Sequence, residues 1–260
     1  MHHGLRPYFA TARMSALEQS YFGLGEVIGG YALRALRLLV LLTLWKALFS
    51  QGADTGGMEL PMLLSYTAAG AAFSDLIDVR TPASAWMHEG SILSQYLRPM
   101  GILPQLAAHA AGGWVMPFLL FSVPVLAVCG AFGIRVLPQS PWFFLSLALS
   151  VSIGFAIDFL FACLVIRLNN AAWLAEVIRR AVTALLSGAV IPFALLPWGI
   201  GGVLSLTPFA SAAGAALSLF AGLEPAQKLI PLQLFWNLLL WPAALFLFRR
   251  SRERMVSHGG

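Results

Sequence analysis

Charged residues are scarce in this chain of 260 residues. Only 10% are Asp, Glu, Lys or Arg, whereas a soluble globular domain has about 25%. Hydrophobic residues make up 59%, and the mean hydropathy is +0.80. A surface with so few charges excludes a soluble monomeric domain. Long apolar runs recur along the sequence, which predicts an all-α, polytopic membrane protein in a lipid bilayer, with about six transmembrane helices at roughly 20 residues each.

Cysteine and catalytic motifs are nearly absent as well. The two cysteines, Cys129 and Cys163, lie in apolar segments and are typical of small buried hydrophobic residues. There is no Gly-rich phosphate loop, no His/Glu zinc pair at helical spacing and no nucleophile elbow. We therefore predict no catalytic residue, no metal site and no cofactor on this chain, which would not itself be an enzyme.

Six apolar stretches have the length of a membrane span. They cover 24–49, 60–79, 106–129, 141–166, 171–196 and 226–248, within a single domain of residues 1–260. No continuous apolar core precedes the first of them, so no cleavable signal peptide is expected. Residues 1–23 instead predict an interfacial helix, and a frayed terminal arm is the alternative. The apolar face of this helix consists of Leu5, Tyr8, Phe9, Ala12 and Ala16.

Positive charge is distributed unevenly between the two sides of the predicted bundle. With both termini in the cytoplasm, the inner side holds Arg6, Arg13, Arg34, Arg37, Arg80, Arg98, Arg167, Arg179, Arg180, Arg249, Arg250, Arg252 and Arg254. The outer side holds only Lys46, Arg135 and Lys228. The positive-inside rule favours this orientation, and the charge of +5 needs no nucleic-acid partner.

The segment 197–222 is apolar but broken by proline and glycine. A full crossing here would make seven spans and place the arginine-rich tail outside, against the same rule. We therefore expect this segment to enter the outer leaflet and return. Irregular backbone at that depth is tolerated only where protein or a water-filled cavity surrounds it.

Four charged residues are predicted at membrane depth: Arg34, Arg37, Asp75 and Asp158. A charge near the bilayer centre costs about 2.5–3.5 kcal/mol on insertion scales, so such side chains face protein or water. They either line a translocation path or pair with one another inside the membrane, for example Arg34 or Arg37 with Asp75 or Asp158. The arginines could also extend to the inner head groups.

The polar stretch 82–98 predicts a short amphipathic helix on the cytoplasmic side. It mixes apolar residues such as Trp86 and Leu97 with polar residues such as His88 and Glu89. A solvated connector and a docking element for a soluble protein are both consistent with this mixture.

Several short motifs, in their order and spacing, carry a family resemblance over most of the chain. The first span ends in Leu44–Phe49 (LWKALF), and Glu89–Ile92 (EGSI) is followed by Leu97–Pro99 (LRP). Later come Leu186–Pro192 (LSGAVIP) and Leu204–Phe209 (LSLTPF). With these motifs the chain resembles the permease subunits of type-2 ABC exporters (the ABC-2 class), particularly the bacterial branch of uncharacterised permeases.

The resemblance implies specific roles and partners. The segment 82–98 would be the coupling helix that contacts an ATPase subunit, through Trp86, His88, Glu89, Gly90, Ser91 and Arg98. An outer hairpin over the translocation path would include Pro192, Pro197, Pro208 and Phe209. The complex would contain two ABC ATPase subunits, which bind ATP and Mg, and a second permease, identical or related. It would lie in the bacterial cytoplasmic (inner) membrane, with a cavity between the first, second and fifth spans.

Arg34 and Arg37 make the first span more charged than this family leads one to expect. They could mark a negatively charged substrate or a pairing with the partner permease. Two other functions stay open from the sequence. One is an ion-gradient-driven secondary transporter that uses Asp158 as its proton or cation site. The other is a membrane scaffold or membrane-embedded enzyme, against which the missing catalytic cluster argues.

Overall fold

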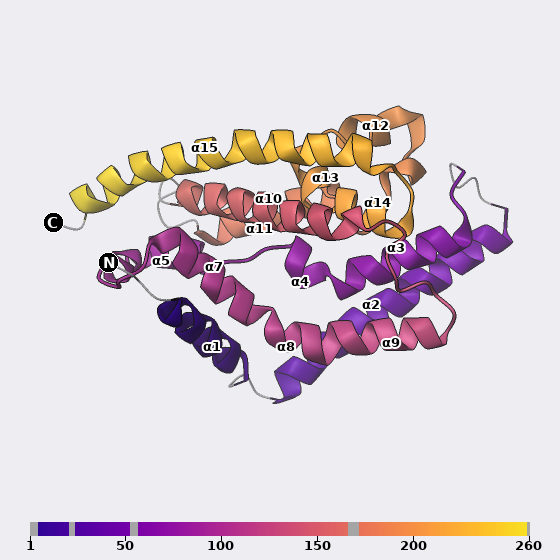
Figure 1. Ribbon diagram of the computed structural model, residues 1–260, viewed down its shortest axis with the longest axis horizontal. Helices are drawn as coiled ribbons and strands as arrows, with labels where there is room; N and C mark the ends of the chain where they lie inside the picture. Colours follow the sequence, from indigo (N-terminus) through magenta and orange to yellow (C-terminus); the bar gives the residue numbers. More distant parts are fainter. Residues whose placement is uncertain (1–4, 21–23, 53–56, 166–171, 259–260) are drawn as a thin grey trace.

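The computed structural model describes residues 5–20, 24–52, 57–165 and 172–258 (Figure 1). No β-strand occurs in these ranges, which confirms the all-α prediction. The α-helices are α1 (Arg6–Ser20), α2 (Leu24–Ser50), α3 (Leu60–Ala72), α4 (Ser74–Ile77), α5 (Ala83–His88), α6 (Ile92–Gln95), α7 (Ile102–Gly113), α8 (Val115–Pro117), α9 (Val123–Ala131), α10 (Trp142–Val165), α11 (Ala172–Leu186), α12 (Ile200–Leu204), α13 (Pro208–Ala212), α14 (Gly214–Ala221) and α15 (Ala226–His258). A π-helix, η1 (Phe118–Ser122), and two 3-10 helices, η2 (Phe193–Leu195) and η3 (Pro197–Gly199), complete the set.

Four helical stretches of the described chain are long and apolar enough to cross a membrane. They are Gly25–Ser50, Ile102–Ala131, Trp142–Val165 and Ala226–Arg250. The chain is therefore a membrane protein, and these stretches correspond to the predicted first, third, fourth and sixth spans. The last helix continues beyond the predicted end at 248, to His258.

The predicted second span, 60–79, is not one helix. Helix α3 ends at Ala72, and Phe73 separates it from the single turn α4. The ring of Phe73 packs against the rings of Phe143 (5.3 Å) and Phe220 (6.0 Å). This aromatic packing holds the chain at the point where it leaves helical geometry.

The third span contains a wide turn, which the sequence analysis did not predict. The π-helix η1 ends at Ser122, two residues before Pro124. Proline lacks an N–H, and its ring clashes with the carbonyl four residues earlier in a regular α-helix. A π-type turn relieves that clash, so the span bends without ending.

The predicted fifth span, 171–196, is also interrupted. Helix α11 ends at Leu186, and Gly188 follows with φ at +69°. A Cβ atom at Gly188 would meet the ring of Phe193, so both the backbone and the space require glycine here. The short elements η2, η3, α12, α13 and α14 follow before α15 begins.

The best-packed pair of helices is α10 and α15, which run side by side in the same direction (Figure 1). Their contact includes a row of polar side chains one turn apart on α15: Gln233, Asn237 and Trp241. Gln233 is fully buried and bonds to Ser146, to Ser150 and to the carbonyl of Ser211. In lipid, such interhelical hydrogen bonds join helices that apolar contact alone does not hold in register.

Helix α1, the described part of the predicted interfacial helix, lies against α7. The hydroxyl of Ser15 is 3.1 Å from Nδ1 of His109. Gly112 lets the two backbones approach, because a Cβ there would overlap the carbonyl of Ala12. Leu5 and Phe9, two residues of the predicted apolar face, are exposed. The remaining parts of the predicted segment, 1–4 and 21–23, lie outside the described residues.

We predict that Gln233→Leu lowers the free energy of unfolding by about 1–3 kcal/mol, because it leaves buried polar partners without hydrogen bonds. The matched control is Gln227→Leu, an exposed glutamine on the same helix, which should change the stability little. Denaturant titration of the purified protein in detergent micelles measures both. Equal effects of the two substitutions would contradict a structural role of Gln233.

Candidate functional site

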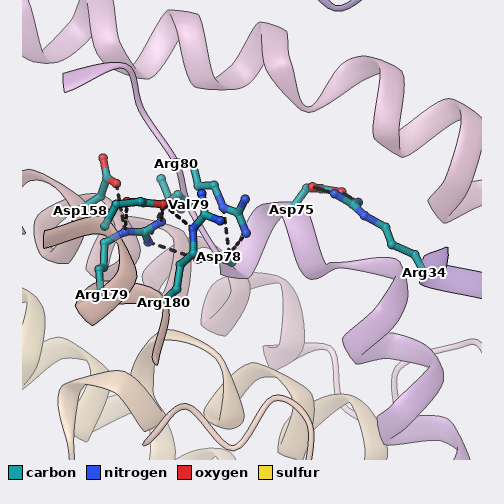
Figure 2. Close-up of polar contacts among 9 residues, drawn as sticks. Arg34, Asp75, Asp78, Val79, Arg80, Asp158, Arg179 and Arg180 are labelled. Atoms are coloured by element: carbon teal, nitrogen blue, oxygen red, sulfur yellow. Dashed lines mark hydrogen bonds and ion pairs between the residues drawn. The ribbon is translucent and has the colours of Figure 1, made fainter. Parts of the chain in front are cut away.

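Two groups of ion pairs lie on either side of the short helix α4 (Figure 2). In the first, Arg34 of α2 holds Asp75 through two parallel bonds, of 2.6 Å from Nη1 and 3.1 Å from Nη2. Such a bidentate arrangement is the strongest form of this pair. The Arg34 guanidinium also lies 5.7 Å from the ring of Tyr31 and 5.8 Å from that of Phe121. Both rings can stabilise its charge.

Arg179 of α11 is the centre of the second group. Its side chain is only 4% exposed. Nε and Nη2 donate to the two oxygens of Glu176, both at 3.1 Å, and Nη1 donates to Asp78 at 3.2 Å. Asp158 of α10 lies 3.8 Å from Nε. Three carboxylates thus surround one buried guanidinium.

Two exposed arginines complete the charge balance of this group. Arg180 donates to Glu176 at 2.7 Å, and Arg80 donates to Asp78 at 2.5 Å. The group therefore contains three acidic and three basic side chains (Figure 2). Its formal charge is zero, which makes its burial at the end of a membrane bundle tolerable.

Asp158 connects this group to the start of α5. Its Oδ2 accepts bonds from the backbone N–H of Thr81 (3.2 Å) and from the Thr81 hydroxyl (2.5 Å). The same hydroxyl accepts the N–H of Ala83, the first residue of α5. A membrane helix, α10, is therefore joined to a short surface helix through two side chains.

The predicted single helix over 82–98 is two short helices. Gly90, with φ at +72°, separates α5 from α6. Met87 and Ile92 are buried against residues of α7 and α10, which fixes both pieces to the bundle. Trp86 is partly buried, with its ring edge-on to His109 at 6.0 Å.

The opposite side of this segment faces outward. Glu89, Gly90 and Arg98 are exposed, Ser91 is partly buried, and Leu97 is 88% exposed. The side chain of His88 lies outside the described residues. The segment 82–98 thus has one side buried against the bundle and another side on which polar and apolar side chains are exposed.

The residues predicted for the outer hairpin are spread over the irregular segment after α11. Pro192 is buried, Pro197 is exposed, and Pro208 and Phe209 are partly buried at the start of α13. Backbone atoms of this segment are bonded to one another and to helix α3. Gly214 donates to the Ser187 carbonyl at 3.0 Å, and the Tyr66 hydroxyl donates to the Gly188 carbonyl at 2.7 Å.

Cavities lie on both sides of the Arg34–Asp75 pair. The smaller, of about 260 Å³, lies between α2, α3 and Ala189–Val190, the segments of the predicted first, second and fifth spans. The larger, of about 790 Å³, is bounded by α1, α2 and α7. Arg34, Asp75, Asp78 and Arg80 border both cavities.

The predicted charges at membrane depth are thus brought together only in part. Arg34 pairs with Asp75, one of the pairings weighed from the sequence. Asp158 pairs instead with Arg179, and Arg37 forms no ion pair with any described residue. The sequence analysis missed the central position of Arg179. The three-residue spacing between Glu176 and Arg179 is a signal that could have predicted a local helical pair, but nothing in the sequence indicates Asp78 or Asp158 as further partners.

Chemically, these groups can bind an anion or hold helices together. Among the described residues, no group of three or more His, Cys, Asp or Glu side chains is arranged to hold a metal ion.

Searches against family models, curated proteins and solved structures found no match to this chain. The family resemblance therefore rests on the sequence motifs alone.

We predict that Arg179→Gln lowers the free energy of unfolding by about 3–5 kcal/mol, because it leaves buried carboxylates uncompensated. The control is Arg180→Gln, which removes an exposed partner of the same Glu176 and should cost about 1 kcal/mol or less. Unfolding in detergent, measured side by side, tests the difference. A loss for Arg179→Gln no larger than that for Arg180→Gln would show that the buried group does not hold the helices.

Proposed function

We propose that this chain is the membrane-spanning permease subunit of an ATP-driven exporter of the ABC-2 class. It would form half of a translocation path with a second, identical or related permease. Two separate ATPase subunits would bind ATP and Mg and dock on α5 and α6. The complex would lie in the bacterial cytoplasmic membrane, with both termini in the cytoplasm.

The observation that carries this proposal is the connection from α5 to α10 through Thr81 and Asp158. A coupling helix must be exposed to a soluble partner and also joined firmly to the membrane bundle. The segment α5–α6 has both properties, because its buried side packs on α7 and α10 while Glu89 and Leu97 are exposed. Displacement of this segment would be transmitted directly to a spanning helix.

The distribution of charge supports the proposed orientation. The end of α15, with Arg249 and Arg250, lies at the same end of the molecule as α5 (Figure 1). Lys46 lies near the C-terminal end of α2, and Lys228 lies in the first turn of α15. Both of these helix ends lie at the end of the molecule opposite α5 (Figure 1). The positive-inside rule then places α5 in the cytoplasm, where an ATPase could reach it.

Six crossings are compatible with the four long helices. In the proposed topology, α3 with α4 forms the second crossing, and α11 with the following irregular segment forms the fifth. The segment up to Gly222 would then be the re-entrant outer hairpin. The second half of this segment, 210–221, is packed inside the protein, as the bonds from Gln233 and Ser150 to the Ser211 carbonyl illustrate, and irregular backbone is tolerated there.

We predict that Glu89→Lys removes ATPase activity from the complex purified through the tagged full chain in mild detergent. A reversed charge on the exposed docking surface would repel the partner, as mismatched charges do at interfaces. The control is Glu59→Lys, an exposed glutamate before α3, which should leave the activity unchanged. Vanadate-sensitive ATP hydrolysis per mole of chain is the measurement. Absence of such activity from the wild-type complex would refute the exporter assignment.

We predict that Thr81→Val leaves the ATPase attached but slows hydrolysis severalfold, because it removes the hydroxyl that bonds to both Asp158 and Ala83 and leaves only the backbone N–H bond to Asp158. Asp158→Asn should also slow hydrolysis, since one oxygen of Asp158 accepts a hydrogen bond from Thr81 and the other lies near the guanidinium of Arg179.

A secondary transporter predicts a different outcome. Asp158→Asn would abolish gradient-driven uptake in vesicles that contain no ATP, and the wild-type chain would support that uptake.

A further inference from the structure

Arg37 is a positive charge on a membrane helix without a matching negative charge. It is exposed on α2, one turn from Arg34, and forms no ion pair with any described residue. Its two arginine neighbours at the cavity are already compensated, Arg34 by Asp75 and Arg80 by Asp78. Of the three arginines that border the smaller cavity, Arg37 is therefore the one that no described carboxylate compensates, and it is available to attract an anion.

The smaller cavity has a second polar residue in its lining besides Arg37. Ser74 lines this cavity, and its hydroxyl is buried and forms no hydrogen bond with a described residue. A buried polar atom without a partner is costly, and a bound ligand would remove that cost. Most of the remaining wall is apolar, including Leu38, Leu41 and Val190. The cavity therefore offers a few polar groups at one place and apolar surface around them, as ligand sites do.

Apolar surface continues from Arg37 along the outside of α2. Leu33, Val40 and Leu44 are between 45% and 68% exposed and lie on the same face as Arg37 at helical spacing, one before it and two after it. An arginine in such a row can bind an anionic head group while a hydrocarbon chain covers the leucines and the valine. A water-soluble anion would gain nothing from this surface.

We propose that Arg37, with Ser74, binds the head group of an anionic amphiphile, a phosphate or carboxylate attached to a hydrocarbon chain. The head group occupies the mouth of the smaller cavity, and the chain lies along Leu38, Leu41 and the exposed row of α2. This deepens the proposed export function, on which the description of the amphiphile as a substrate rests. The binding itself does not depend on that function.

The test uses the purified full chain in a maltoside detergent and dodecyl phosphate as the probe. Because a ligand that binds the folded state raises the melting temperature, a titration of that temperature reports binding. Dodecyl phosphate should raise the melting temperature of the wild-type protein. Arg37→Gln should increase the concentration for half the maximal shift about tenfold, the effect of losing one charge-assisted bond. Lys46→Gln, which removes an exposed charge from the same helix, should leave it unchanged.

Two further probes separate the head group from the chain. Inorganic phosphate and dodecyltrimethylammonium should give no shift at the same concentrations. A shift by inorganic phosphate equal to that of dodecyl phosphate would overturn the amphiphile, since a free anion would then suffice. An equal shift by the cationic probe would overturn the role of charge.

Two outcomes with Arg37→Gln would overturn the site itself. One is an unchanged titration with dodecyl phosphate. The other is the same unchanged titration together with a lower mass of the Arg37→Gln complex in solution. That combination would assign Arg37 to the contact with a second permease. If dodecyl phosphate binds as expected but no ATPase accompanies the chain, the binding site stands and the export function fails.

Discussion

The buried guanidinium of Arg179 is the interaction on which the arrangement of the bundle end depends. An arginine that is 4% exposed at the end of a membrane helix is tolerable only when carboxylates surround it. Those carboxylates come from α10, from α11 and from the residue that follows α4. Removing any of these elements would leave an uncompensated charge, so their relative positions are fixed together.

Broken helices elsewhere in the molecule obey the same requirement for polar partners. Each interruption exposes backbone groups that lipid cannot satisfy. Tyr66 donates to the carbonyl of Gly188 directly after α11, and Ser122 donates to the carbonyl of Ala72 directly before the break at Phe73. Gln233 reaches the carbonyl of Ser211 at the end of α13. Polar side chains of packed helices thus support the chain at the points where neighbouring helices are interrupted.

The sequence predicted the all-α class and the four long spans because hydropathy acts locally, over about 20 residues. It also predicted the pair Arg34–Asp75 as one of several options. It could not predict that Asp158 would join Thr81 and Arg179, because that choice depends on how α10 and α11 pack. The breaks at Phe73 and Gly188 were missed for a similar reason. Phe73 is held by aromatic rings distant in sequence, and the helix end at Gly188 depends on the ring of Phe193.

Helix α4 relates the two ion-pair groups in a way that bears on mechanism. Asp75 and Asp78 are three residues apart, and their partners lie on different elements, α2 and α11 (Figure 2). Thr81, three residues further on, joins the start of α5 to Asp158. An anion that drew Arg34 away from Asp75 would release one end of this seven-residue connection. Because coupling between two sites is reciprocal, a partner that moved α5 would in turn change the affinity for that anion.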